Sequence, residues 1–166
     1  MRKSRALAAT FAFFLLAPGT VAGFVPWWIT GWRVQAAFPG LVIAQAAGIA
    51  LILLGLWPLV ESFARFALEG LGTPAPIAPT KRLVISGFYR FVRNPMYVGV
   101  VSLALGQALL FADLRLAVYG AAVWLAMHLF VILYEEPKLA RTFGEDYAAF
   151  RANVPRWIPR REPWKG

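Results

Sequence analysis

Residues 41–60 read LVIAQAAGIALILLGLWPLV, a run of 20 residues that contains no charged side chain. A helix of roughly 20 apolar residues is long enough to cross the hydrocarbon core of a bilayer. The run therefore predicts a membrane-spanning helix, and apolar stretches of similar character lie on both sides of it.

The composition of the whole chain agrees with this interpretation. Hydrophobic residues make up 60% of the 166 residues, and charged residues only 15%. Soluble domains carry roughly 45–50% apolar and about 25% charged residues. Because a soluble globule could not hide so much apolar surface from water, the composition excludes that class and indicates an integral membrane protein.

Three further stretches predict membrane helices, over residues 6–29, 95–111 and 116–134. The first contains Pro18-Gly19, which we expect to kink it within a bundle that tolerates the kink. Its start also resembles a cleaved secretory signal, but the apolar run continues past the possible cleavage site, so we favour a retained helix.

The ends of the later helices carry clear signals. Asn94 is a typical helix cap and Pro95 suits the first helical position. A helical pattern continues beyond residue 134 until Gly144 stops it, and a short amphipathic helix follows to about Asn153. The expected fold is one all-α membrane domain over 1–166, with about four spans and a short C-terminal helix.

Basic residues gather in the segments on one side of the predicted membrane. Only Arg33 and Arg115 fall in the two connections on the other side. This pattern predicts that both chain ends are cytoplasmic. The net charge of +9 then reflects topology and anionic headgroups, and nucleic acid is not expected as a partner. The excess of arginine over lysine and the abundant alanine hint at a bacterial source, hence an inner membrane.

Metal and thiol chemistry are not expected. The chain has no cysteine and one histidine, His128, so it offers no thiolate and no pair of histidines for a metal.

Two polar features on the cytoplasmic side suggest a binding site. Arg93 and the cap Asn94 stand at the start of a helix, where exposed amides favour anions. The pair Glu135-Glu136 follows the last apolar helix and suits a cation or the hydroxyls of a ribose. A ligand that touches both features would carry a carboxylate, an ammonium and a sugar diol, as S-adenosylmethionine does. The simpler alternative is that Arg93 only anchors the chain at the membrane surface and that Glu135 and Glu136 are only solvated.

Residues 81–99 and 135–159 carry two long motifs. The first contains G-x-Y-x-x-x-R-N-P-x-Y-x-G from Gly87 to Gly99, and the second contains E-E-x-x-L-x-x-x-F-G-x-x-Y-x-x-F from Glu135 to Phe150. Both resemble the isoprenylcysteine carboxyl methyltransferase and phospholipid methyltransferase families. Many members have histidine where Asn94 stands, so an acid–base role at this position is not expected here.

The resemblance implies an S-adenosylmethionine-dependent membrane enzyme that methylates a lipid-like or prenyl-type acceptor. The cofactor-binding residues that it implies are Val84, Gly87, Tyr89, Arg93, Asn94, Pro95, Tyr97, Gly99, Glu135, Glu136 and Leu139. Phe143, Gly144 and Tyr147 are expected to pack behind them.

His128 and Glu135 are the candidate catalytic residues. His128 lies seven residues before Glu135, which would put both on one helix face. The alternatives are a base or orienting group for the substrate, and a buried imidazole bonded to a neighbouring helix.

Two other functions stay open at this stage. An NADPH-dependent membrane reductase could use a related core, although the paired glutamates would repel the ribose phosphate. A non-enzymatic membrane protein of the same fold would bind no cofactor. The oligomeric state is not readable: Gly48 and Gly55 could pack helices within one chain or between chains.

Overall fold

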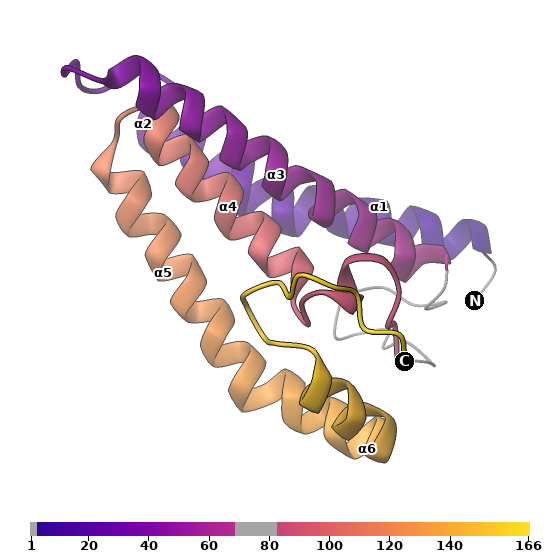
Figure 1. Cartoon of the computed structure of the whole chain (residues 1–166). Coiled ribbons are helices and arrows are strands. Elements are labelled where there is room, and N and C mark those ends of the chain that lie inside the picture. Colours follow the sequence, from indigo (N-terminus) through magenta and orange to yellow (C-terminus); the bar gives the residue numbers. More distant parts are fainter. Residues whose placement is uncertain (1–2, 69–82) are drawn as a thin grey trace.

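The computed structural model describes residues 3–68 and 83–166, and its regular secondary structure over these residues is helical (Figure 1). This confirms the predicted all-α membrane bundle. Six α-helices, two π-helical turns (η1 and η3) and one 3-10 turn (η2) follow one another in the described part of the chain. They are α1 Lys3–Gly19, η1 Thr20–Phe24, α2 Val25–Thr30, α3 Leu41–Leu68, η2 Gly87–Arg90, α4 Pro95–Leu110, α5 Leu114–Phe130, η3 Val131–Glu135 and α6 Glu136–Asn153.

Three stretches of helix in the described residues are long and apolar enough to cross a membrane: Phe11–Thr30, Leu41–Arg65 and Leu114–Asn153. The third predicted span, 95–111, corresponds to α4, an apolar helix of only 16 residues. At about 1.5 Å per residue it is shorter than the hydrocarbon core, and it packs between α3 and α5 (Figure 1).

The antiparallel helices α3 and α4 pack closely because their glycines face each other. A Cβ atom at Gly48 would lie 2.6 Å from the carbonyl oxygen of Gly106. A Cβ atom at Gly99 would lie 2.7 Å from the carbonyl oxygen of Gly55. Each helix thus places two glycines seven residues apart on the shared face. The structure settles the open alternative for Gly48 and Gly55, which pack helices within the chain.

The helix that begins at α1 continues through Pro18 into the π-helical turn η1 rather than ending there. The neighbouring helices donate hydrogen bonds to carbonyls in this irregular stretch. Gln107 Nε2 of α4 donates to the carbonyl of Ala22 at 2.7 Å, and the hydroxyl of Tyr119 in α5 donates to that of Val21 at 2.7 Å. These bonds show how the bundle accommodates the predicted distortion.

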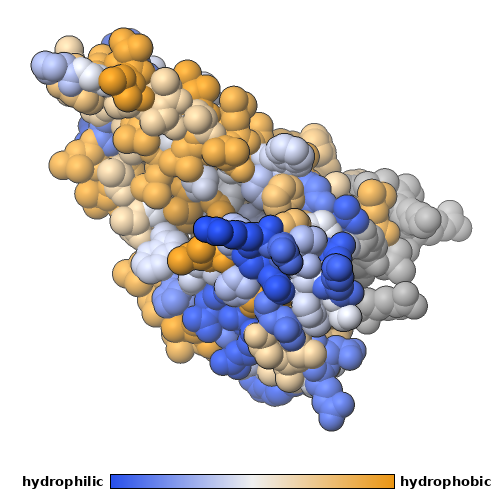
Figure 2. All heavy atoms as spheres, viewed as in Figure 1, coloured by the Kyte–Doolittle hydropathy of each residue, from blue (hydrophilic) through white to orange (hydrophobic). Residues whose placement is uncertain are grey.

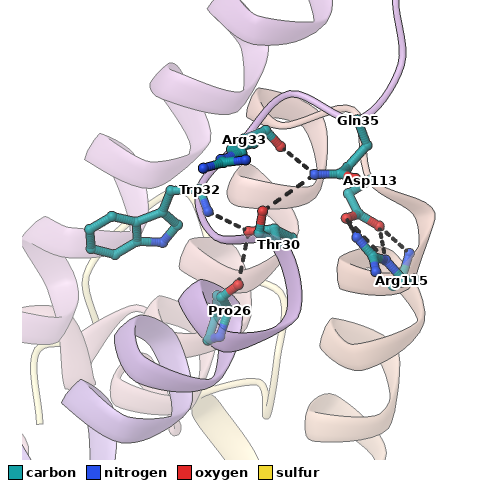
Figure 3. Close-up of polar contacts among 7 residues, drawn as sticks. All are labelled: Pro26, Thr30, Trp32, Arg33, Gln35, Asp113 and Arg115. Atoms are coloured by element: carbon teal, nitrogen blue, oxygen red, sulfur yellow. Dashed lines mark hydrogen bonds and ion pairs between the residues drawn. The ribbon is translucent and has the colours of Figure 1, made fainter.

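Polar contacts order the turns at the end of the bundle far from the C-terminus (Figure 3). The Thr30 hydroxyl donates to the carbonyl of Pro26 at 2.9 Å, one turn back in α2. The backbone amide of Gln35 donates to the carbonyl of Phe111 at 2.8 Å and so joins the two turns. Asp113 accepts the backbone amide of Arg115 at 2.9 Å and caps α5. The fourth predicted helix therefore starts at Leu114, two residues earlier than expected, because Asp113 is its cap.

The surface divides into an apolar part and a polar end. Hydrophilic residues gather over the end that carries α6 and the C-terminal tail, whereas the long helices present apolar residues (Figure 2). Large side chains such as Val42, Leu54 and Trp57 are 77%, 70% and 69% exposed. Such surface suits contact with lipid chains rather than water.

The glycine contacts predict a specific stability effect. Replacing Gly106 by Ala would force α3 and α4 apart, because a Cβ there meets the Gly48 carbonyl at 2.8 Å. We expect a loss of about 1–3 kcal/mol in the free energy of unfolding, as in overpacked cores. Thermal unfolding of the detergent-purified protein measures it. The control is Gly23→Ala, where a Cβ meets nothing within 4 Å. Equal stability of the two variants would contradict the packing.

Candidate functional site

A cavity of about 90 Å³ lies at the polar end of the bundle. Its walls come from three parts of the chain: the segment before and after η2, the first turn of α4, and the helix from η3 through α6. The lining residues are Leu83, Val84, Tyr89, Arg93, Asn94, Met96, Tyr97, Val131, Glu135, Glu136, Leu139, Tyr147 and Phe150.

The first wall is held against the end of α3. The backbone amide of Phe88 donates to the Glu61 carboxylate at 3.4 Å. Gly87 has φ = +55°, and the same carboxylate occupies the space that a Cβ atom on Gly87 would need. Glycine is therefore required there for both conformation and space. Glu61 also pairs with Arg65, one turn farther along α3, at 2.7 Å.

Glu136 joins three distant segments through two arginines. Arg156 Nε donates to Oε1 of Glu136 at 2.7 Å, and Arg156 Nη2 donates to Oε2 at 2.9 Å. Arg93 Nη1 lies 3.2 Å from Oε1 of the same carboxylate. A carboxylate bonded by two guanidinium groups tolerates its burial, which is otherwise costly.

Residues 154–164, which we name the C-terminal strap, run along the segment before α4. Backbone amides of Arg93, Arg160 and Trp164 donate to the carbonyls of Pro155, Phe91 and Arg90, each at 2.9 Å. In Figure 1 this strap passes between the ends of α4 and α6. The strap thus holds in place the segment before α4, which forms one wall of the cavity.

Asn94 occupies the N-cap position of α4, as predicted, but its side chain makes no capping hydrogen bond. Its amide Nδ2 instead donates to the carbonyl of Arg156 in the strap at 3.1 Å, and no side-chain hydrogen bond reaches the helix start. Pro95 does occupy the first turn, as predicted. A capping bond would need the side-chain oxygen to accept a helix amide, whereas the bond to the strap uses the amide nitrogen as donor.

The adjacent glutamates point to different partners. Whereas Glu136 binds the arginines, Glu135 accepts the Tyr97 hydroxyl at 3.0 Å. Tyr89 lies nearby, and burial, together with the charge of Glu135, raises the pKa of its phenol well above the usual value. Tyr97 is therefore bonded directly to Glu135, whereas Tyr89 feels the charge of that carboxylate from nearby.

Arg93, which lines the cavity, has one buried donor that is not used. Its side chain is 9% exposed, and its Nε atom is buried with no hydrogen-bond partner among the described residues. Its Nη1 also donates to the Tyr147 hydroxyl at 3.4 Å. Buried polar groups are nearly always hydrogen-bonded, so a free Nε beside a cavity suits an acceptor on a ligand.

His128 lies outside the cavity lining, and the predicted alignment with Glu135 is altered. The π-helical turn η3 stands between them and adds a residue to the turn, which rotates the residues beyond it relative to α5. Trp157 Nε1 of the strap donates to His128 Nδ1 at 3.0 Å, and Trp124 stacks on the imidazole with ring centroids 5.2 Å apart. Since the indole is only a donor, Nδ1 is the unprotonated nitrogen.

The cavity brings together eight of the predicted residues. They are Val84, Tyr89, Arg93, Asn94, Tyr97, Glu135, Glu136 and Leu139. Gly87, Pro95 and Gly99 support the walls instead, and Gly99 packs on α3. Tyr147 lines the cavity rather than only packing behind it, while Phe143 packs against the adjacent apolar cluster.

Several residues at the site were not predicted. Met96, Val131 and Phe150 line the cavity, and Arg156 binds Glu136. The one signal for Met96 was its place inside the first motif, between Pro95 and Tyr97. Arg156 gave no such signal, since it was one cation among many in the tail.

Comparisons with known proteins agree with this geometry. Residues 43–146 match the family model described as Phospholipid methyltransferase. Over 77 residues the chain is 35% identical to Protein-S-isoprenylcysteine O-methyltransferase of Schizosaccharomyces pombe. That alignment covers 46% of this chain and 33% of the relative, so the match spans about a third of the relative's length. Both findings confirm the resemblance carried by the two motifs.

The bond between Trp157 and His128 is directly testable, because the chain has one histidine. In protein labelled with ¹⁵N-histidine, we expect the neutral imidazole to carry its proton on Nε2. Replacing Trp157 by Phe keeps a ring but removes the donor, so both tautomers should then be populated. Trp28→Phe, at an exposed site on α2, is the control. A proton on Nδ1 in the unmodified protein would contradict the described contact.

Proposed function

The chain belongs to the phospholipid methyltransferase family, and we propose on this basis that it is a membrane methyltransferase for a lipid-like or prenyl-type acceptor. The observation that carries the proposal is the cavity itself. Its two main walls contain the two motifs, which the fold brings together from 83–97 and 131–150.

We propose S-adenosylmethionine as the methyl donor. The free Nε of Arg93 would bind its carboxylate, and Glu135 with Tyr97 would bind its ammonium or hydroxyl groups. Glu136 would act indirectly, because its two oxygens already bind Arg93 and Arg156. S-adenosylmethionine supplies a methyl group on a sulfonium centre, and the residues described here would hold and orient it.

The size of the cavity implies movement on binding. Ligand pockets usually enclose about 300–1,000 Å³, and this cavity holds about 90 Å³. A nucleoside-sized ligand therefore requires at least one wall to shift. The C-terminal strap, which is bonded to the segment 90–93 beside the cavity, is the part we expect to move, since loop-like segments open at lower cost than packed helices.

The chemistry needs little besides placement. Methyl transfer is an in-line displacement, and correct approach of the donor and acceptor atoms at about 3–3.5 Å lowers much of the barrier. Apolar residues such as Val84, Met96 and Leu139 would exclude water from the transfer path. A carboxylate acceptor requires no base. For an amine acceptor, His128 could act as a base only after releasing Trp157, because its Nδ1 lone pair accepts the indole.

We propose that the cavity opens to the cytoplasm and that the acceptor arrives from the bilayer. The basic residues of the strap and of α6 favour a cytoplasmic position for this end of the molecule. If the source is bacterial, the membrane concerned is the inner one. The neighbouring apolar helices α4 and α5 then offer the route from the lipid phase.

Calorimetric binding of S-adenosylhomocysteine to detergent-purified protein tests the donor. We expect micromolar affinity, weakened at least about tenfold in Glu135→Gln through loss of a charged acceptor. Glu145→Gln, a change at an exposed site of α6, should bind like the unmodified protein. NADPH, titrated in parallel, should not bind. Binding of NADPH without S-adenosylhomocysteine would overturn the proposal and favour a reductase.

A further inference from the structure

A second hollow lies on the outer surface of the helix that runs from α5 into α6. It is a groove of about 350 Å³, lined by Leu133, Tyr134, Lys138, Arg141 and Thr142. It shares no lining residue with the cavity described above. The two hollows therefore lie on different faces of the same helical stretch.

The groove lies at the level of a membrane boundary. Tyr134 is 20 residues beyond Leu114, the first residue of α5. At about 1.5 Å per residue this is about 30 Å, the thickness of the hydrocarbon core. Leu133 is 72% and Tyr134 45% exposed, as expected of side chains that face lipid and its interface. Lys138 and Arg141 follow one and two turns farther out, at the level of the headgroups.

The two cations of the groove form no ion pair with a carboxylate in the part of the chain that the structure describes, although the charge of Lys138 acts on the more distant Glu135. Lys138 Nζ donates to the Tyr134 hydroxyl at 3.2 Å and lies 5.3 Å from the centre of that ring. Arg141 Nε donates to the carbonyl of Pro137 at 3.2 Å, and its two terminal nitrogens remain available. Within residues 3–68 and 83–166, neither cation pairs with a carboxylate, in contrast to Arg93 and Arg156.

Apolar surface continues from the groove toward the membrane centre. Phe130 packs on Tyr134 with ring centroids 5.1 Å apart, and it is 39% exposed. Along one helix face the order is thus apolar, aromatic and cationic. This order matches that of a phospholipid, from acyl chain to interface to phosphate.

We propose that this groove binds an anionic bilayer phospholipid of the leaflet on the C-terminal side. Its phosphate would lie between Lys138 and Arg141, and an acyl chain would follow Leu133 and Phe130. A guanidinium group binds phosphate oxygens in pairs and an ammonium adds a point charge. A lipid with a net negative charge is preferred over a zwitterionic lipid, because the choline group would add a third cation. The proposal does not rest on the methyltransferase function.

Thermal unfolding in a neutral detergent, with added lipid, tests the groove. Phosphatidylglycerol should raise the unfolding midpoint by at least about 2–4 °C, and phosphatidylcholine should raise it less. Native mass spectrometry should show one phosphatidylglycerol retained. Both effects should disappear in the double variant Lys138→Ala/Arg141→Ala and persist in Lys138→Arg/Arg141→Lys, which retains the charges.

The matched control is Arg161→Ala/Lys165→Ala, which removes the same charge from exposed positions at the end of the chain. It should respond to phosphatidylglycerol like the unmodified protein.

An equal response in the Lys138→Ala/Arg141→Ala variant, or equal responses to the two lipids, would overturn the proposal. Stabilisation by inorganic phosphate alone, lost in that variant, would show a free-anion site and would overturn the lipid assignment. If the Lys138→Ala/Arg141→Ala variant does not fold, the Lys138→Arg/Arg141→Lys variant decides the question. The proposal is overturned if this charge-retaining variant loses both the midpoint shift and the retained lipid.

Discussion

The ion cluster of Glu136 with Arg93 and Arg156 is the interaction on which the site depends. Arg93 precedes α4, Glu136 begins α6, and Arg156 belongs to the C-terminal strap. Glu136 is only 7% exposed, so losing either arginine would leave a poorly compensated buried charge. The cluster joins these three segments beside the cavity, and it fixes the side chain of Arg93, whose Nε stays unbonded.

A rigid frame of helices presents these segments to one another. The glycine faces of α3 and α4 set the distance between those helices, and Glu61 at the end of α3 holds the turn at Gly87. The turn then delivers Tyr89 and Arg93 to the cavity. Helix α3 thus takes part both in the close glycine packing with α4 and in the polar contact of Glu61 with the turn at Gly87. The packing of the bundle and the position of the cavity wall therefore depend on the same helix.

The sequence predicted what depends on local patterns and missed what depends on long-range pairing. Apolar runs and the two motifs predicted the bundle and most of the cavity lining, since residues such as Tyr97 and Glu135 lie at fixed positions in helices. The π-helical turn before Glu136 cannot be recognised from the spacing of residues. The alignment of His128 with Glu135 was therefore predicted for an uninterrupted α-helix, which the chain does not form there. The partners of Asn94 and Arg156 lie about 60 and 20 residues away, which local pattern cannot reveal.

A double-mutant cycle between Glu136 and Arg156 tests the central claim most directly. The free energy of unfolding is measured for the unmodified protein, Glu136→Gln, Arg156→Met and the double variant. The account predicts a coupling energy of about 0.5–3 kcal/mol, because each single change removes the same interaction. Additive effects of the two substitutions would contradict it, since the strap would then be held independently of Glu136.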